Sequence, residues 1–133
     1  MNLSKEYTID LKMETKKIII ADVNPESRKW IKLDLDSIKD KELKIDEIST
    51  GNDLVEKVST ENYDLGVIAY KLPELDGIEA TKKIRETDKN IPIIMVSGLY
   101  EFVKERAKKA GITDGISKPY DLKELADLVN KYL

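Results

Sequence analysis

The segment from Tyr63 to Gly77 is the part of the sequence whose residue types and spacing point to chemistry. Its apolar run at 65–68 carries no charge, as in a strand that is covered on both faces. The proline, aspartate and glycine within 73–77 are turn residues, so the strand ends in a loop. Open parallel sheets carry their functional groups beyond the carboxyl ends of their strands. The residue at that end is Ala69, and its type decides which chemistry is available.

The composition excludes several classes of function. The 133 residues include no cysteine and no histidine, which rules out disulfides, zinc sites built on these residues and histidine-based catalysis. Hydrophobic residues make up 41% and charged residues 37%, as in one globular domain with a charged surface. The net charge of −3 argues against nucleic acid and membrane as partners. Since we find no membrane-spanning segment and no signal peptide, we expect a cytoplasmic location.

Three short apolar runs predict strands, two further short segments complete a set of five, and helical spacing of apolar residues between them predicts helices. The connections are short, and such alternation implies an α/β domain with a doubly wound parallel sheet and helices on both faces. A Gly-rich phosphate-binding loop is missing from the sequence. The predicted strands cover residues 17–21, 43–49, 64–69, 91–96 and 113–117.

Local signals predict where the helices begin and end. Asn24 followed by Pro25 is typical of a helix start, and Gly111 of a helix end. Asp121 and Glu124 have the spacing of a capping box for the last helix. The residues predicted to face the core are Ile31, Leu35 and Ile38; Ile78, Thr81 and Ile84; Val103, Ala107 and Ala110; and Leu122, Leu125, Val129 and Tyr132.

Residues 1–15 differ from the rest because apolar and polar residues alternate between positions 7 and 13. We interpret them as a disordered or cloning-derived leader, since chain termini are commonly loose. The alternative is an added edge strand, or a strand lent to a neighbouring copy. The folded domain is predicted to cover residues 16–133.

Four motifs follow one another from Lys16 to Leu133. They are IIIAD at 18–22, YDL…KLPELDG across 63–77, PIIMVSG at 92–98 and GITDGISKPY at 111–120. In this order and spacing they resemble a response-regulator receiver domain, the phosphoryl-accepting module of two-component signalling. The resemblance implies a flavodoxin-like, five-stranded parallel sheet in the order 2-1-3-4-5. It also implies a cis peptide bond between Lys118 and Pro119.

The resemblance further implies a phosphorylation pocket at the strand ends. Receivers place two acids after the first strand, an acceptor aspartate after the third, a hydroxyl after the fourth and a lysine after the fifth. The acceptor carboxylate attacks phosphorus, and magnesium neutralises the transferred group. Asp22, Ser97 and Lys118 match the first acid, the hydroxyl and the lysine.

Three positions depart from the receiver pattern. Val23 stands at the second acid, Ala69 at the phosphoacceptor, and Gly115 where many receivers carry an aromatic switch residue. A methyl group is no nucleophile, and a valine offers no oxygen to a metal. Asp22 and Lys118 alone sum to zero charge, so we expect neither a metal site nor another cofactor. We expect these two side chains to form an ion pair instead.

The departures predict a pseudo-receiver, which is not an enzyme and binds a protein partner without being phosphorylated. One alternative is a conventional receiver that was inactivated by engineering at Ala69. Val23 and Gly115 are independent departures, however, and favour natural degeneration. The other alternative is a small-molecule site in the vacated pocket at the ends of the first and third strands.

The predicted partner surface comprises the helix around 103–110, the strand 113–117 and the last helix. Its predicted aromatic anchors are Tyr100, Phe102 and Tyr120, with Arg106 beside them, because aromatic and arginine side chains dominate interface energies. The partner would be a signalling or output protein, or a second copy of this chain. The alternative is that Phe102 belongs to the core and that the charged residues only face solvent.

Overall fold

The computed structural model describes residues 13–133, in which five parallel strands form one sheet in the order β2-β1-β3-β4-β5. Five helices alternate with these strands, and the predicted doubly wound, flavodoxin-like fold is confirmed. The strands are β1 (Glu14–Ala21), β2 (Lys41–Ile48), β3 (Leu65–Ile68), β4 (Ile93–Ser97) and β5 (Asp114–Ser117). The helices are α2 (Pro25–Leu35), α3 (Gly51–Thr60), α4 (Gly77–Arg85), α5 (Tyr100–Ala110) and α6 (Glu124–Tyr132).

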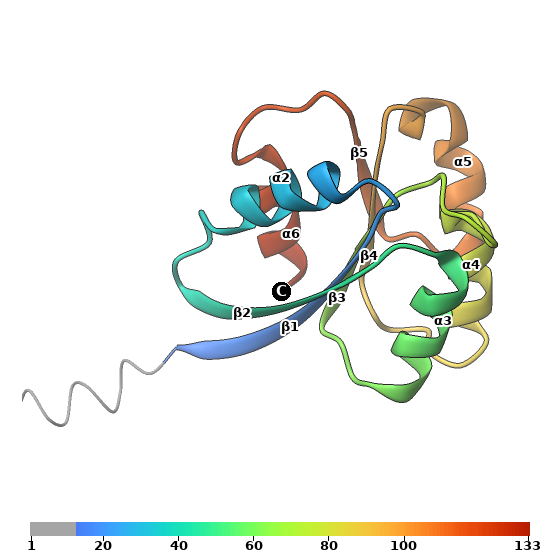
Figure 1. The fold of residues 1–133 in the computed structure, drawn as a ribbon, viewed down its shortest axis with the longest axis horizontal. Coiled ribbons are helices and arrows are strands. Elements are labelled where there is room, and N and C mark those ends of the chain that lie inside the picture. The colour runs from blue at the N-terminus through green and yellow to red at the C-terminus, as the bar shows by residue number, and fades with distance from the viewer. Residues whose placement is uncertain (1–12) are drawn as a thin grey trace, which may run out of the picture.

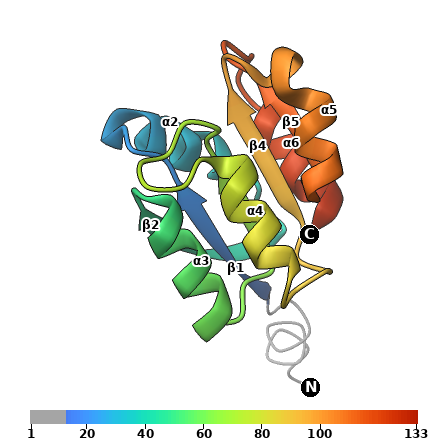
Figure 2. The same ribbon diagram turned by 90° about the vertical axis from the view of Figure 1, so that its right-hand side faces the viewer.

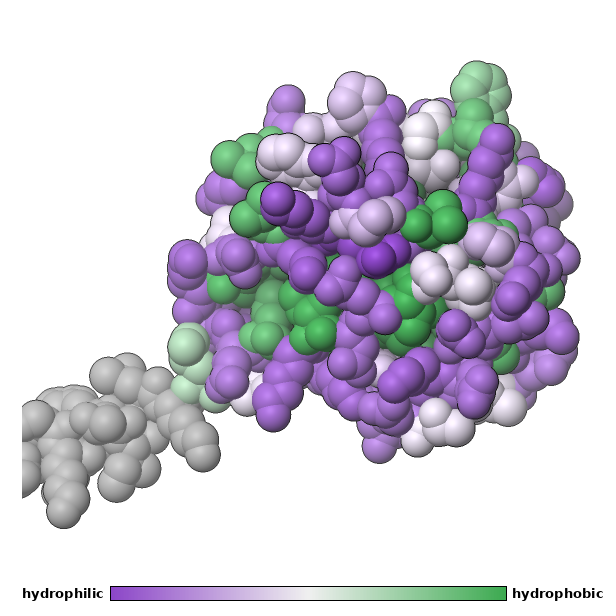
Figure 3. Space-filling view, in the orientation of Figure 1, coloured by the Kyte–Doolittle hydropathy of each residue, from purple (hydrophilic) through white to green (hydrophobic). Residues whose placement is uncertain are grey.

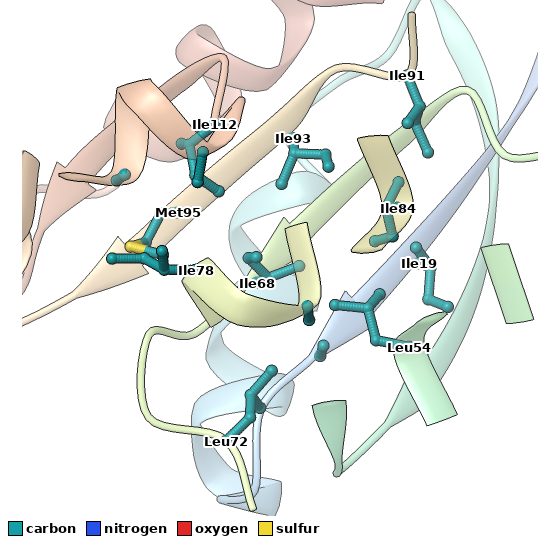
Figure 4. Packing of buried hydrophobic residues seen from close by; sticks show 14 of the residues in the cluster. Ile19, Leu54, Ile68, Leu72, Ile78, Ile84, Ile91, Ile93, Met95 and Ile112 are labelled. Carbon is teal, nitrogen blue, oxygen red and sulfur yellow. The ribbon is translucent and has the colours of Figure 1, made fainter. Parts of the chain in front are cut away.

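The sheet lies between two layers of helices. Helices α2 and α6 cover one face, and α3, α4 and α5 cover the other (Figures 1 and 2). Every residue of β3 and β4 is buried, so these strands are continuous apolar runs rather than alternating ones. Each face has its own core. Figure 4 shows the one under α3, α4 and α5, where Leu54, Ile84 and Ile112 converge on the sheet.

One face of the molecule is mainly hydrophilic. Hydrophilic residues cover most of the face seen in Figure 3, and apolar residues show there in scattered patches. Among the described residues, no helix combines the length and the apolar character that a membrane crossing requires.

Strand β1 begins earlier than predicted. It starts at Glu14, which pairs with Lys41 of β2, so the folded domain begins before residue 16. The backbone of the polar residues before the apolar run forms hydrogen bonds with β2, and this pairing extends β1 toward its amino end. The predicted leader otherwise falls on residues 1–12, which lie outside the described part, and stays a prediction.

Two of the three predicted helix boundaries are confirmed. The side chain of Asn24 accepts a hydrogen bond from the backbone of Glu26 at 2.9 Å, and Pro25 opens α2. Gly111 ends α5 in the left-handed region, with φ of 111°. The Ile-, Val- and Ala-rich faces predicted for α2, α4 and α5 are buried.

The capping box predicted for the last helix is wrong. The carboxylate of Glu124 does accept a bond from the backbone of Asp121 at 2.9 Å, but no side chain caps α6 locally. Lys123 precedes the helix with a left-handed φ of 74°. Leu122, predicted to face the core, is 82% exposed, because it precedes the first turn of α6.

The cap of α6 comes from α2 instead. Asp34 is 3% exposed, and its two carboxylate oxygens accept from the backbone amides of Lys123 at 2.6 Å and Ala126 at 3.1 Å. The first amides of a helix lack partners within it and favour a negative charge nearby. Asp34 therefore joins the two helices that cover this face of the sheet.

Replacing Asp34 with alanine should destabilise the domain by about 2–4 kcal/mol, because a buried amide and a partly buried amide lose a charged acceptor. Urea unfolding measures this change. Asp36→Ala, at an exposed position just after the same helix, is the matched control and should stay within about 0.5 kcal/mol of the original chain. An equal effect of the two substitutions would refute the capping role.

Candidate functional site

The register of the sheet brings the predicted site residues together at its carboxyl edge. Ala21 of β1 pairs with Ile68 of β3, so the next residues, Asp22 and Ala69, follow neighbouring strands. The amide of Ala69 donates to the carbonyl of Ala21 at 2.8 Å and extends this pairing. Ser97 ends β4 opposite Ser117, and Lys118 follows directly.

Asp22 places a carboxylate at this edge of the sheet, where it is almost fully buried. The residue is 5% exposed, and its Oδ1 accepts from the backbone amide of Asn24 at 3.0 Å. Its Oδ2 lies 3.5 Å from Nζ of Lys118, which confirms the predicted ion pair. Because the guanidinium of Arg28 also donates to the Asp22 carbonyl at 2.6 Å, the loop after β1 is tied to α2.

Lys118 has a second contact that the sequence analysis missed. Its Nζ donates to the hydroxyl of Ser27 at 2.7 Å, so the ammonium joins the end of β5 to the first turn of α2. The peptide bond between Lys118 and Pro119 is cis, as predicted. No local pattern marks Ser27, because its partner lies 91 residues away in the sequence.

Val23 and Ala69 contribute only carbon to this edge. Val23 is 52% exposed, and Ala69 is partly buried at the end of β3. Within residues 13–133 there is no group of three or more histidine, cysteine or acidic residues placed to hold a metal ion. Magnesium requires oxygen ligands, and a single carboxylate that already faces a lysine does not fit that requirement.

The hydroxyl of Ser97 is engaged within its own turn. It accepts a hydrogen bond from the backbone amide of Leu99 at 3.0 Å, and Ser97 is 9% exposed. Leu99 in turn precedes α5 without a side-chain cap. The serine therefore shapes the connection from β4 to α5.

The loop after β3 is held by backbone contacts and by one arginine. A Cβ on Gly77 would lie 2.2 Å from the carbonyl oxygen of Ala69, so glycine is required at this close approach. Asp76 and Glu79 form the capping box of α4, which agrees with the structural role predicted for Asp76 and Gly77. The hydroxyl of Tyr70 accepts from Arg106 of α5 at 3.1 Å.

The predicted anchor Tyr100 is wrong as a surface residue. It is 2% exposed and lies in the core under α5. Phe102, the alternative core residue, is instead 85% exposed. The sequence could have predicted both positions. Helical spacing places residue 100 on the same inner face as Val103, Ala107 and Ala110, and it places residue 102 on the outer face.

Tyr120 also lies elsewhere than predicted. Its ring packs with the core under α2 and α6, and burial followed by the carboxylates of Asp34 and Asp22 raises the pKa of its hydroxyl. Tyr120 borders a groove of about 700 Å³ between α2 and the loop after β5. The groove is lined by Asn24, Glu26, Ser27, Trp30, Asp34, Lys118, Pro119, Tyr120 and Leu122, and so by neither Val23 nor Ala69.

Comparisons with known proteins agree with this geometry. The family described as "Response regulator receiver domain" matches residues 18–130. Sporulation initiation phosphotransferase F of Bacillus subtilis is 30% identical over 123 residues, which are 91% of this chain and 96% of that protein. Chemotaxis protein CheY of Bacillus subtilis is 34% identical over 88 residues, covering 65% of this chain and 73% of that protein.

Other relatives are much longer than this chain, and solved structures share its fold. Sensor protein EvgS of Escherichia coli is 31% identical over 75% of this chain, which spans 8% of that protein. The receiver domain of sensor histidine kinase PA1611 from Pseudomonas aeruginosa, solved with magnesium in its active site cleft, is 25% identical. It covers 89% of this chain and 97% of its own, with a TM-score of 0.78. A putative response regulator from Chloroflexus aurantiacus has a TM-score of 0.80 at 20% identity, covering 90% and 98% of the two chains.

Replacing Lys118 with alanine should destabilise the domain by about 1 kcal/mol, because Asp22 loses its counter-charge and Ser27 its donor. The loss stays modest because the lysine side chain is 38% exposed and screened by solvent. Urea unfolding at low and high salt measures it, and high salt should reduce it. Lys29→Ala, at an exposed position of α2, is the control and should change little. Equal stabilities of the two variants would contradict a structural ion pair.

Proposed function

We propose that this chain, which belongs to the response regulator receiver domain family, is a pseudo-receiver of two-component signalling. It binds a protein partner through a preformed surface and accepts no phosphoryl group. The residue that carries this proposal is Ala69, at the end of β3.

Phosphoryl transfer to a receiver needs a nucleophile at that strand end. A carboxylate oxygen attacks phosphorus and leaves an acyl phosphate, whereas the methyl group of Ala69 has no lone pair to donate. The nearby oxygen nucleophile, Asp22, is 5% exposed and faces Lys118. Both of its carboxylate oxygens are engaged, one by the Asn24 amide and one by Lys118, and its burial limits the approach of a phosphodonor.

The charge balance of the edge supports the same proposal. Asp22 and Lys118 sum to zero, so no excess negative charge attracts a divalent cation. Magnesium loses its hydration shell reluctantly and needs one or two carboxylates together with a phosphate. Val23 supplies no further oxygen ligand, so the residues at this edge do not fit a magnesium ion.

Natural degeneration explains the chain better than a single engineered change at Ala69. Val23 departs from the receiver pattern at a second position. Gly115 departs at a third, and the ring of Tyr100 packs where a side chain at 115 would lie. One substitution at residue 69 accounts for none of these features.

The exposed side of α5 is the surface that we propose for the partner. Phe102 projects from it with 85% exposure, and Arg106 lies one turn further along. Exposed aromatic and arginine side chains are typical interface anchors. Charged residues surround the two and would form the polar rim, namely Glu101, Glu105, Lys108 and Lys109.

A small-molecule site is the second candidate, and the groove beside α2 favours it. Its volume of about 700 Å³ is in the range of ligand pockets. The indole of Trp30 and the ammonium of Lys118 border it. The groove lies beside the receiver edge rather than between the ends of β1 and β3, so the site differs in place from the predicted vacated pocket.

Restoring phosphorylation should require two substitutions. Ala69→Asp alone leaves Val23 where receivers carry their second acid, and the remaining acid, Asp22, is paired with Lys118. Ala69→Asp with Val23→Asp restores, together with Asp22, the three carboxylates of the receiver pattern. Trp30 is the single tryptophan of the chain and lies beside Lys118, so its fluorescence reports on this edge. Titration with beryllofluoride and magnesium should change this fluorescence in the double variant alone.

Ala69→Asn with Val23→Asp is the matched control for this titration, because it keeps the size and removes the nucleophile. Radiolabelled acetyl phosphate provides an independent readout of the same variants. Labelling of the Ala69→Asp variant by itself would favour an engineered receiver over natural degeneration.

Partner binding should depend on the exposed side of α5. Phe102→Ala and Arg106→Ala should each weaken capture of the partner by the immobilised chain about tenfold or more, as loss of an interface anchor does. Trp30→Ala, on the opposite side of the sheet, is the control and should retain capture. Unchanged capture by both α5 variants would count against this surface, as would capture that requires a phosphodonor.

A further inference from the structure

Tyr100 fills the space between α5 and β5 with an aromatic ring. It is the first residue of α5 and is 2% exposed. Gly115 lies in β5 directly beneath it. A Cβ built on Gly115 would lie 2.2 Å from Cε1, 2.4 Å from Cζ and 2.7 Å from Cδ1 of the ring. These separations are below any real carbon contact, so the ring and a side chain at 115 exclude each other.

Gly115 is therefore needed for space and not for backbone freedom. It lies in a regular strand, and Gly111 is the glycine with positive φ among the described residues. Interiors are close-packed, and an extra methyl group in such a place forces neighbours out of their rotamers. The contact fixes the position of α5 relative to β5.

The start of α5 has backbone hydrogen bonds from Phe102 and Val103 to the Leu99 carbonyl, but no side-chain cap. Leu99 provides no side-chain cap, and the turn before it is closed by the hydroxyl of Ser97 accepting from the Leu99 amide. The ring of Tyr100 is the large buried group in this first turn. Phe102 follows two residues later on the outer side of the same turn.

We propose that Tyr100, packed on Gly115, is a positioning residue that holds the first turn of α5 in one arrangement and so keeps Phe102 displayed. The aromatic ring comes from the helix and stays in place, which makes the surface independent of any event at the carboxyl edge. The packing of Tyr100 on Gly115 does not depend on the proposed function, whereas the role of Phe102 in binding a partner rests on the function proposed above.

The aromatic ring of Tyr100, and not its hydroxyl group, makes the contact with Gly115. The hydroxyl of Tyr100 finds no partner among the protein groups of residues 13–133, and burial followed by Asp114 raises its pKa. Removing an unpaired buried hydroxyl does not weaken packing. Tyr100→Phe is therefore the conservative variant that should preserve the arrangement.

A double-mutant cycle tests the contact. Gly115→Ala should raise the unfolding equilibrium constant about 5- to 150-fold when Tyr100 is present. In a Tyr100→Ala background the same substitution should have almost no effect, because the space is free. Equal effects of Gly115→Ala in the two backgrounds would overturn the proposal.

Fluorine NMR tests the consequence for the surface. Phe102 is the single phenylalanine of the chain, so fluorophenylalanine labels that position alone. The full chain should give one sharp resonance. Tyr100→Ala should broaden, split or shift it, and Tyr100→Phe should leave it in place beside the new resonance of residue 100.

Tyr63→Ala is the control, because it also removes a buried tyrosine but lies in the connection just before β3. It should lower stability without moving the Phe102 resonance. An unmoved resonance in Tyr100→Ala, or an equal change in Tyr63→Ala, would overturn the positioning role. Phosphorylation of the chain would instead contradict the proposed function and leave the cycle result intact.

Discussion

The ion pair between Asp22 and Lys118 is the interaction on which the carboxyl edge of the sheet depends. It joins the loop after β1 to the end of β5 across a separation of 3.5 Å. The buried carboxylate requires a nearby positive charge, and the lysine provides it while also contacting Ser27 of α2. Because the pair is neutral, the buried carboxylate has its counter-charge within the chain. Val23 and Ala69 add only carbon atoms beside it.

Local patterns in the sequence predict much of the fold. The central strands β3 and β4 were readable because parallel, doubly covered strands are apolar runs, and Asn24 and Gly111 act through their own backbone neighbourhood. The register of β1, β3, β4 and β5 then follows from the fold, and with it the meeting of Asp22 with Lys118. The chemistry at the end of β3 was predictable because it depends on the type of one residue, Ala69.

Contacts between distant segments were not predictable in the same way. Asp34 caps α6 from a helix 89 residues earlier, and nothing near Asp121 signals that the local capping box fails. Tyr100, predicted as a surface anchor, is a core residue, whereas Phe102 is exposed, because aromatic character alone does not distinguish a core residue from a surface anchor. Their helical phase relative to Val103 does, and the small residue at Gly115 explains how so large a ring fits.

The central claim is that no phosphoryl group is carried at the end of β3. Intact-mass spectrometry of the purified chain, after incubation with acetyl phosphate and magnesium, measures this directly. A single species at the unmodified mass is expected, because Ala69 offers no nucleophile. A second species, heavier by one phosphoryl group and lost on treatment with hydroxylamine as an acyl phosphate would be, would contradict it.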